Sequence, residues 1–218
     1  MKRACYVVLG ILVGNLQWVS AEEPFAWNTL AKETSEVLSS GEAVVLPCRP
    51  DEVGKEDIDS RFVSVAKLIS GSRERIWEVI HDKEDAEHFL DGVLESRVLE
   101  ESEKEIIVEQ RTHVGGPKGD YLYQLRHRLT PHTRSDFTYI KGEIRNVIGT
   151  WWIFDGPSAD RHLVVYSLHI DPGVFAPQFV VKRGMKKSMP GTILSIQREV
   201  QSRAEKDDEA AEQPEDQD

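Results

Sequence analysis

The stretch from residue 171 to residue 203 constrains the fold of this chain more than any other part of the sequence. Its apolar residues recur every three or four positions and so share one face of a helix; they are Val181, Met185, Met189, Ile193, Ile196 and Val200. Pro177 suits the first turn of that helix, whereas Pro190 is expected to break or kink it near its middle. The pattern predicts a long amphipathic helix whose apolar face must be covered by another layer.

Strand-like segments fill most of the chain before this helix. Six of them follow one another, at residues 93–100, 105–112, 120–130, 134–140, 146–154 and 162–170. Turn residues such as Gly115-Gly116-Pro117 and Asp155-Gly156-Pro157 separate them. Short connections of this kind indicate an antiparallel meander rather than a parallel sheet.

The region before the meander predicts both helices and strands. The sequence favours a short helix at 24–41 over the outside of the domain, a short strand at 43–46, a loop at 49–59 and a first long strand at 61–69. Ser72 can cap a helix with Ile76, Trp77 and Ile80 on one face, and a short helical piece follows at 83–89. We expect an α+β fold, in which a curved antiparallel sheet of about seven strands grips the long C-terminal helix, with two short helices after the first long strand.

The two ends of the chain differ from its middle. Lys2 and Arg3, an apolar run at 6–13 and the small residues Val19-Ser20-Ala21 predict a cleavable secretory signal peptide over 1–21. The acidic run at the other end has almost nothing apolar to bury and predicts a disordered tail over 204–218. A helical segment at 22–40 and one domain at 41–203 are expected between them. The protein is therefore predicted to be secreted or periplasmic.

Composition and motifs argue against several classes of function. The formal net charge is −11, and no basic stripe interleaved with aromatic residues is present, so we expect no nucleic-acid partner. The seven histidines show no H-E-x-x-H or other metal-ligand spacing. The sequence also lacks G-x-S-x-G and a phosphate-binding glycine loop. We expect no metal and no cofactor.

Several local stretches resemble one known superfamily when they are read together with the order of the elements. They are Ala66-Lys67-Leu68-Ile69 leading to Ile76-Trp77-Glu78-Val79-Ile80-His81-Asp82, then Gly149-Thr150-Trp151-Trp152, Val164-Val165-Tyr166, and Asp171-Pro172-Gly173 leading to Pro177. The chain from about 41 to 203 resembles the START-like superfamily, also called SRPBCC. The resemblance implies the helix-grip fold of lipid-transfer domains, coenzyme Q-binding proteins and polyketide cyclases. The motifs are packing signatures, and none of them is catalytic.

The resemblance also implies a cavity between sheet and helix that holds a hydrophobic or amphipathic small molecule, such as a lipid or a quinone. Large rings with a polar tip suit such a site, because they contact an apolar body and orient a head group. The candidate ligand-binding residues are Trp77, Phe89, Tyr123, His127, Tyr139, Trp151, Tyr166, Phe175, Met185 and Met189. These side chains could instead fill the core, and the chain would then be a binding module for another protein.

A competing hypothesis is an enzyme of the cyclase or dehydratase type. On the strand at 120–130, Tyr121, Tyr123, Leu125, His127 and Leu129 share one face, while Gln124, Arg126 and Arg128 share the other. His127, Tyr123 or Arg126 could polarise a carbonyl and move a proton, provided that at least two of them converge in the cavity. His113, Asp136 and His169 each stand on a strand without a partner that the sequence identifies.

Two features of the last helix predict how a ligand enters. Lys182, Arg183, Lys186 and Lys187 are neighbours on a helix surface and form a basic strip, which predicts transient contact with anionic membrane surfaces. Gly184, Pro190 and the residues at 173–176 weaken the start of the helix, so residues 173–189 are predicted to move as a gate. A rigid corner with Phe175 buried would explain the same residues.

Overall fold

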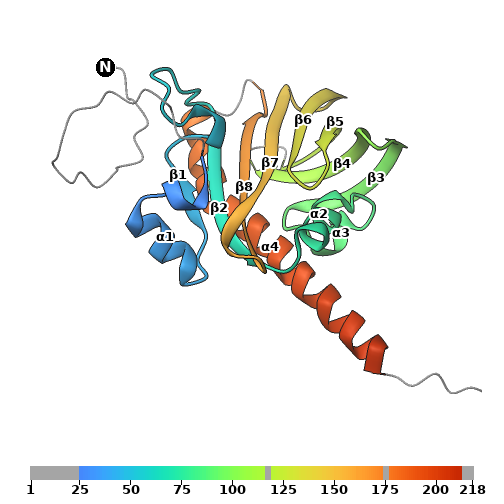
Figure 1. Ribbon diagram of the computed structural model, residues 1–218. Helices are drawn as coiled ribbons and strands as arrows, with labels where there is room; N and C mark the ends of the chain where they lie inside the picture. Colours follow the sequence, from blue (N-terminus) through green and yellow to red (C-terminus); the bar gives the residue numbers. More distant parts are fainter. Residues whose placement is uncertain (1–24, 116–118, 174–176, 213–218) are drawn as a thin grey trace, which may run out of the picture.

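The computed structural model describes residues 25–115, 119–173 and 177–212 (Figure 1). The predicted order of elements is confirmed, with a long strand, two short helices, six strands and a long helix. In chain order the elements are η1 (Trp27–Thr29), α1 (Lys32–Ser39), β1 (Val44–Leu46), η2 (Pro50–Glu52), β2 (Val63–Ser70), α2 (Arg73–His81), α3 (Ala86–Phe89), β3 (Val93–Glu101), β4 (Glu105–Gly115), β5 (Gly119–Thr130), β6 (Arg134–Gly142), β7 (Asn146–Ser158), β8 (Arg161–Asp171) and α4 (Gln178–Glu212).

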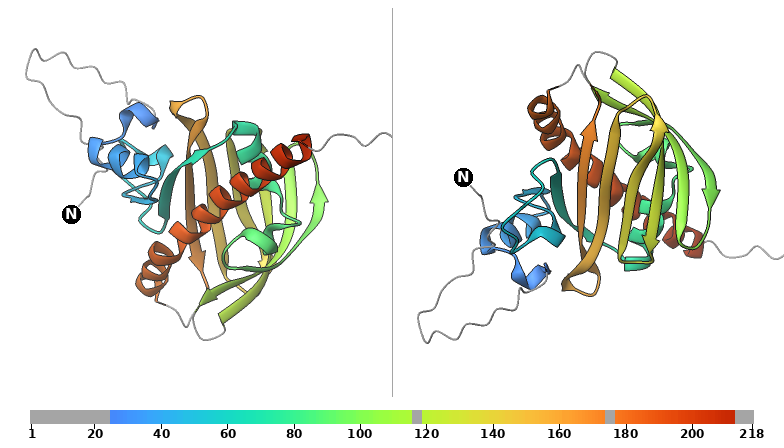
Figure 2. Two further views of the ribbon diagram at one scale, coloured as in Figure 1. Left: turned by 90° about the horizontal axis from the view of Figure 1, so that it is seen from below. Right: turned by 90° about the horizontal axis from the view of Figure 1, so that it is seen from above.

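One antiparallel sheet of eight strands forms the body of the molecule. Its strand order is β1-β2-β8-β7-β6-β5-β4-β3. The strands β3 to β8 form the predicted meander, and the long strand β2 pairs with β8, so the first long strand lies beside the last. Figure 2 shows that the sheet curves without closing into a barrel. The curvature produces a concave face that one helix can occupy.

Helix α4 crosses the concave face of the sheet (Figure 2). The side chains of Met185, Met189, Ile193, Ile196 and Val200 are at most 6% exposed. They pack in one cluster with inward-facing residues of the strands and of α2. The apolar stripe is therefore buried as predicted, and the helix-grip architecture is confirmed.

The path of α4 differs from the prediction in two respects. Pro190 does not break it, since the helix is continuous from Gln178 to Glu212; its first turns run in another direction than the rest (Figure 2), a bend that a residue without an N–H group permits. The helix also continues past residue 203, where a disordered tail was predicted. Alanine and glutamate favour helix in this extension, and Asp207 forms an ion pair with Arg75 of α2. Residues 213–218 lie outside the described residues.

The N-terminal segment covers the opposite face of the sheet. Phe25 and Leu38 pack in a second cluster with outward-facing residues of the sheet such as Leu68 and Trp152. This second cluster explains why β7 and β8 carry apolar side chains on both faces of the sheet. The single helix predicted at 24–41 is wrong in detail, because Leu30 and Ala31 adopt extended backbone angles and separate η1 from α1. The loop predicted at 49–59 contains the short helix η2.

Side-chain contacts fix α4 to the helices that follow β2. Arg203 donates to Asp82 at 2.7 Å, at the end of α2, and to Glu199 at 2.8 Å. The loop after α3 is held by Arg198, which lies 3.2 Å from the carboxylate of Asp91. The second half of α4 is thus bonded to α2 and to the loop between α3 and β3.

Candidate ligand-binding cavity

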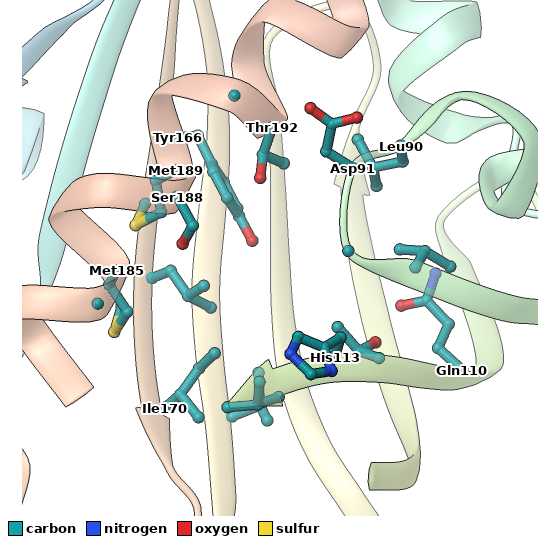
Figure 3. A pocket seen from close by; sticks show the side chains of 18 of the residues that line it. Leu90, Asp91, Gln110, His113, Tyr166, Ile170, Met185, Ser188, Met189 and Thr192 are labelled. Carbon is teal, nitrogen blue, oxygen red and sulfur yellow. The ribbon is translucent and has the colours of Figure 1, made fainter. Parts of the chain in front are cut away.

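A cavity of about 680 Å³ lies between the sheet and α4. Figure 3 shows it from close by, with side chains from the helix and from the strands pointing into it. Its buried wall is mainly apolar or aromatic and consists of Tyr123, Leu125, Phe137, Val147, Trp151, Leu168, Ile170, Met185 and Met189, joined by the polar residues Lys83, Gln110 and His127. The volume and the composition of the wall are typical of sites that enclose one small molecule.

Strand alternation places the β5 side chains as the sequence predicted. Tyr121, Tyr123, Leu125 and His127 are buried, between 3% and 6% exposed. The last three of these line the cavity. Arg126 lies on the other face, where it pairs with Glu105 of β4 at 3.3 Å. Of the groups proposed for catalysis, Tyr123 and His127 therefore share the cavity and Arg126 does not.

The ten predicted ligand-binding residues do not all reach the cavity. Tyr123, His127, Trp151, Tyr166, Met185 and Met189 line it, while Phe175 lies outside the described residues. Trp77 packs against His81, with ring centroids 3.8 Å apart and planes inclined by 31°. Phe89 lies under the guanidinium of Arg203, and the hydroxyl of Tyr139 donates to the Gly142 carbonyl. These three side chains make other contacts, and no ligand-binding role follows for them from the geometry.

The structure gives contacts for the three strand residues that the sequence left without partners, His113, Asp136 and His169. His113 lines the cavity at its exposed rim and lies 2.6 Å from Asp120. Asp136 accepts hydrogen bonds from Arg134 and from the Thr150 hydroxyl. His169 packs against Phe62, and burial lowers its pKa. Only His113 of these three belongs to the cavity wall.

Lys83 is the group that sequence reasoning missed. It follows α2, in a turn that was predicted to be helical, and its side chain is 5% exposed in the cavity wall. Its ammonium group donates to the Ile80 carbonyl, and the hydroxyl of Ser96 donates to the Lys83 carbonyl. Burial lowers the pKa of Lys83 to about 8, and neighbouring Asp82 opposes the shift. A lysine between acidic residues gives no sequence signal of burial.

His127 is a second nitrogen group of the buried wall. Its Nδ1 lies 3.4 Å from the Ser135 hydroxyl, and its Nε2 has no hydrogen-bond partner within the part of the chain that the structure describes. Burial and the nearby positive charge of Lys83 lower the pKa of His127 well below its usual value. The imidazole is therefore neutral at pH 7 and keeps one nitrogen available inside the cavity.

Two tyrosines of the cavity wall differ in the hydrogen bonding of their hydroxyl groups. The Tyr123 hydroxyl donates to the Thr112 hydroxyl at 2.8 Å, and burial raises the pKa of Tyr123 to about 12. Tyr166 stacks on Trp151, and Figure 3 shows its hydroxyl pointing into the cavity. Within the described ranges the Tyr166 hydroxyl has no hydrogen-bond partner, and burial raises its pKa. Tyr166 therefore offers a free hydroxyl on a fixed ring.

The cavity opens beside the first half of α4. The exposed residues of its wall are Asp91, Gly92, His113, Val180, Gly184, Lys187 and Ser188. Phe179, just before Val180, is 75% exposed. Of the predicted basic strip, Arg183, Lys186 and Lys187 are exposed, while Lys182 donates to the Ser60 carbonyl. The mouth therefore combines exposed apolar side chains with exposed cations.

No helix of the described residues is long and apolar enough to span a membrane. Nor do the described ranges contain a group of three or more histidine, cysteine, aspartate or glutamate side chains that could hold a metal ion.

Solved structures with the same fold include cyclases and lipid-transfer proteins. The Zhui aromatase/cyclase from Streptomyces sp. R1128 is 15% identical, with a TM-score of 0.55 over 70% of this chain and 98% of that one. Human StAR-related lipid transfer protein 5 is 13% identical, with a TM-score of 0.57 over 74% and 82%. A STAR-related lipid transfer protein from Xanthomonas axonopodis is 14% identical, with a TM-score of 0.55 over 67% and 90%. Identities this low show the shared fold alone.

The sequence itself decides the family. A comparison with curated proteins gave no match. A family model, by contrast, matches residues 69–194, from the end of β2 to the middle of α4, and so includes every element that lines the cavity. This match covers more than half of the chain. The chain therefore belongs to the family described as polyketide cyclase / dehydrase and lipid transport.

Proposed function

We propose that this chain binds one hydrophobic or amphipathic small molecule, such as a lipid or a quinone, in the cavity under α4. The observation that carries the proposal is the cavity of about 680 Å³ with a mainly apolar buried wall. Lipid-transfer proteins among the solved structures of this fold support it. Binding in such a site consists of burial and needs no bond-making group.

Burial alone supplies enough free energy for a carrier. Each methylene group removed from water contributes about 0.8 kcal/mol, so a chain of roughly 15 methylenes contributes of order 10 kcal/mol before ordering costs. Met185 and Met189 on the helix side suit ligands of irregular shape, because the thioether side chain adapts its conformation.

The proposal includes transient contact with a membrane at the cavity mouth. Phe179 and Val180 are 75% and 50% exposed at the start of α4. Arg183, Lys186 and Lys187 are exposed on the next two turns. Exposed apolar side chains beside cations favour binding to an anionic lipid surface. Together with the signal peptide predicted at 1–21, this makes the chain an exported carrier, secreted or periplasmic.

The test compares two tryptophan substitutions on α4. Thr192 points into the cavity in Figure 3, so Thr192→Trp fills it. Leu194 is 38% exposed and is not part of the wall, so Leu194→Trp is the matched control. Native mass spectrometry with added phospholipids, fatty acids and quinones is expected to show a bound ligand on the wild type and on L194W. Loss of about tenfold or more in affinity is expected for T192W.

Two results would contradict the proposal. One is a wild-type protein that shows no mass shift with any of these ligands. The other is equal binding by T192W and the wild type, which would place the ligand elsewhere on the molecule. Circular dichroism of both variants checks that their folds are intact.

A second candidate function is a cyclase or dehydratase reaction in the same cavity. The observation that favours it is the free Nε2 of the neutral His127, which could accept a proton from a bound substrate. Tyr123 supplies little acid catalysis, since its hydroxyl is bonded to Thr112 and its pKa is raised to about 12. The test is single-turnover conversion of a bound polyketide analogue. His127→Gln should abolish conversion and retain binding, whereas equal conversion by both proteins would exclude His127 as the base.

A further inference from the structure

Lys83 is a buried cation in the wall of the cavity. Its side chain is 5% exposed and donates to the Ile80 carbonyl. Among the described residues no carboxylate lies within 4.0 Å of its ammonium nitrogen. Lys67 of β2, which is 1% exposed and donates to the Gly41 carbonyl, is a second buried lysine without an ion pair, but it does not line the cavity. Asp91, the carboxylate in the same wall, is bonded to Arg198 at the rim instead. The ammonium group therefore keeps N–H donors that nothing in the described chain satisfies.

A ligand that fills this cavity changes the hydration and the electrostatic surroundings of the Lys83 ammonium group. An apolar molecule expels water from the wall, and a buried ammonium without water or counter-charge is strongly destabilised. A ligand with its own negative charge at that point removes the penalty and adds a charge-assisted hydrogen bond. The charge on Lys83 thus discriminates against ligands that are apolar throughout.

A network of hydrogen bonds holds the backbone of Lys83 in place. Its backbone N–H donates to the His81 carbonyl, and its carbonyl accepts from the Ser96 hydroxyl, which in turn accepts from the Gln110 amide. Contacts from α2, β3 and β4 therefore hold this one turn in place. Tyr166 in β8 also lines the cavity and adds a free hydroxyl donor on a stacked ring.

We propose that Lys83 is the anion-recognition residue of the cavity and that its ligand is a hydrophobic molecule carrying a carboxylate. The inference rests on the proposed function, because it names the class of ligand for the same site. His127, whose pKa is lowered by burial and by the nearby charge of Lys83, can donate to a carboxylate oxygen in the tautomer that carries its proton on Nε2, and the Tyr166 hydroxyl is a further donor in the cavity wall.

The first experiment compares three ligands with the same chain and different heads. Hexadecanoate, methyl hexadecanoate and hexadecanol are titrated by calorimetry into the wild type, Lys83→Met and Lys187→Met. Lys187 is the other lysine of the cavity wall and lies at its exposed rim, so K187M tests whether a rim cation sets the preference instead. The wild type and K187M should bind hexadecanoate at least about tenfold more tightly than the ester and the alcohol, and K83M should reduce that preference to within about threefold.

The second experiment uses the wild type alone and measures proton uptake. The titratable or charged groups around the ammonium are Asp82, His81 and His127, with Asp91, His113, Tyr123, Tyr166 and Lys187 in the rest of the wall. The pKa of Lys83 is lowered to about 8 by burial, and a bound carboxylate raises it again. Titration at pH 8 in buffers of different ionisation enthalpy should therefore show uptake of about half a proton per hexadecanoate.

The outcomes separate this inference from the proposed function. If the three ligands bind the wild type equally, or if K83M keeps the preference, the inference is overturned and the proposed function stands. If K187M loses the preference and K83M keeps it, the rim cation recognises the head and the inference is again overturned. If none of the three binds, both fail. Proton release on binding hexadecanoate would mean that Lys83 becomes neutral, which also contradicts the inference.

Discussion

Tyr166 and Trp151 lie face to face on neighbouring strands, with ring centroids 4.0 Å apart and planes inclined by 11°. The two residues are direct partners in the register of β7 and β8. Both line the cavity, and Figure 3 shows the Tyr166 hydroxyl pointing into it. The stack therefore fixes the direction of a polar group inside an apolar pocket.

The first prediction distinguishes the role of the Tyr166 ring from the role of its hydroxyl group. Tyr166→Phe keeps the stack and removes only the free hydroxyl, so the free energy of unfolding should change by less than about 1 kcal/mol. Affinity for a ligand with a polar head should fall by about three- to tenfold. Trp151→Ala removes the stacking partner and should cost about 3 to 5 kcal/mol of stability. Urea unfolding and ligand titration measure both; a large loss of stability in Y166F would show that the hydroxyl is structural.

The second prediction concerns Gly149, which lies in β7 opposite Phe137 of β6. A Cβ atom on Gly149 would come within 2.2 Å of the Phe137 ring and within 2.5 Å of the Ser167 carbonyl oxygen. Gly149→Ala should therefore destabilise the protein by about 1 to 3 kcal/mol or more, through overpacking. The double variant Gly149→Ala/Phe137→Leu should recover part of that loss. Thermal unfolding checks both, and a G149A protein as stable as the wild type would contradict this account of the contact.

The third prediction is a pH dependence of stability from Lys83. Its pKa is about 8 in the folded protein against 10.5 when unperturbed, so the unfolded chain binds more protons between these values. The Lys83 contribution to the free energy of unfolding therefore rises as pH increases from about 8 to about 10.5, by up to about 3 kcal/mol. Lys83→Met should remove this rise, while Lys186→Met on the exposed face of α4 should retain it.

Urea unfolding of the three proteins between pH 7 and pH 10 measures this effect. Comparing variants at each pH cancels the titration of other groups, including Tyr123, whose pKa is raised to about 12. Parallel curves for the wild type and K83M would show that Lys83 is hydrated in the folded state.

The fourth prediction concerns opening of the cavity. The second half of α4 is bonded to Asp82 and Asp91 through Arg203 and Arg198, whereas the first half carries the exposed Phe179 and Val180. Amide hydrogens at 178–189 should therefore exchange faster than those at 193–203, and a bound ligand should slow them. Hydrogen exchange by mass spectrometry measures this. Equal and ligand-independent protection of both halves would favour a rigid start of the helix.

The architecture was predictable because it depends on periodicity. The spacing of Met185, Met189, Ile193, Ile196 and Val200 fixed which face of α4 is buried, and alternation along β5 fixed the inward side of Tyr123 and His127. Turn residues between the strands determined the meander. In each of these cases the backbone geometry of one element decides the outcome, so local sequence is sufficient.

Long-range contacts decided what local sequence could not. The polar extension after residue 203 was misread as disordered, although Asp207 meets Arg75 of α2. Trp77 and Phe89 pack against the same core cluster as the cavity wall, yet they contact His81 and Arg203 and do not line the cavity. Composition records how apolar a side chain is and does not say whether it faces a cavity or fills the core.

The sequence by itself determined the fold, the family and the inward face of each main element, because these follow from patterns within single helices and strands. Only the tertiary structure decided that Lys83 is buried in the cavity wall and that no carboxylate of the described residues pairs with its ammonium group. Lys83 lies among charged residues in the sequence, and its environment is created by strands β3 to β5, which come later in the chain. Burial of a charge is a property of what the fold packs around it, so no local pattern could reveal it.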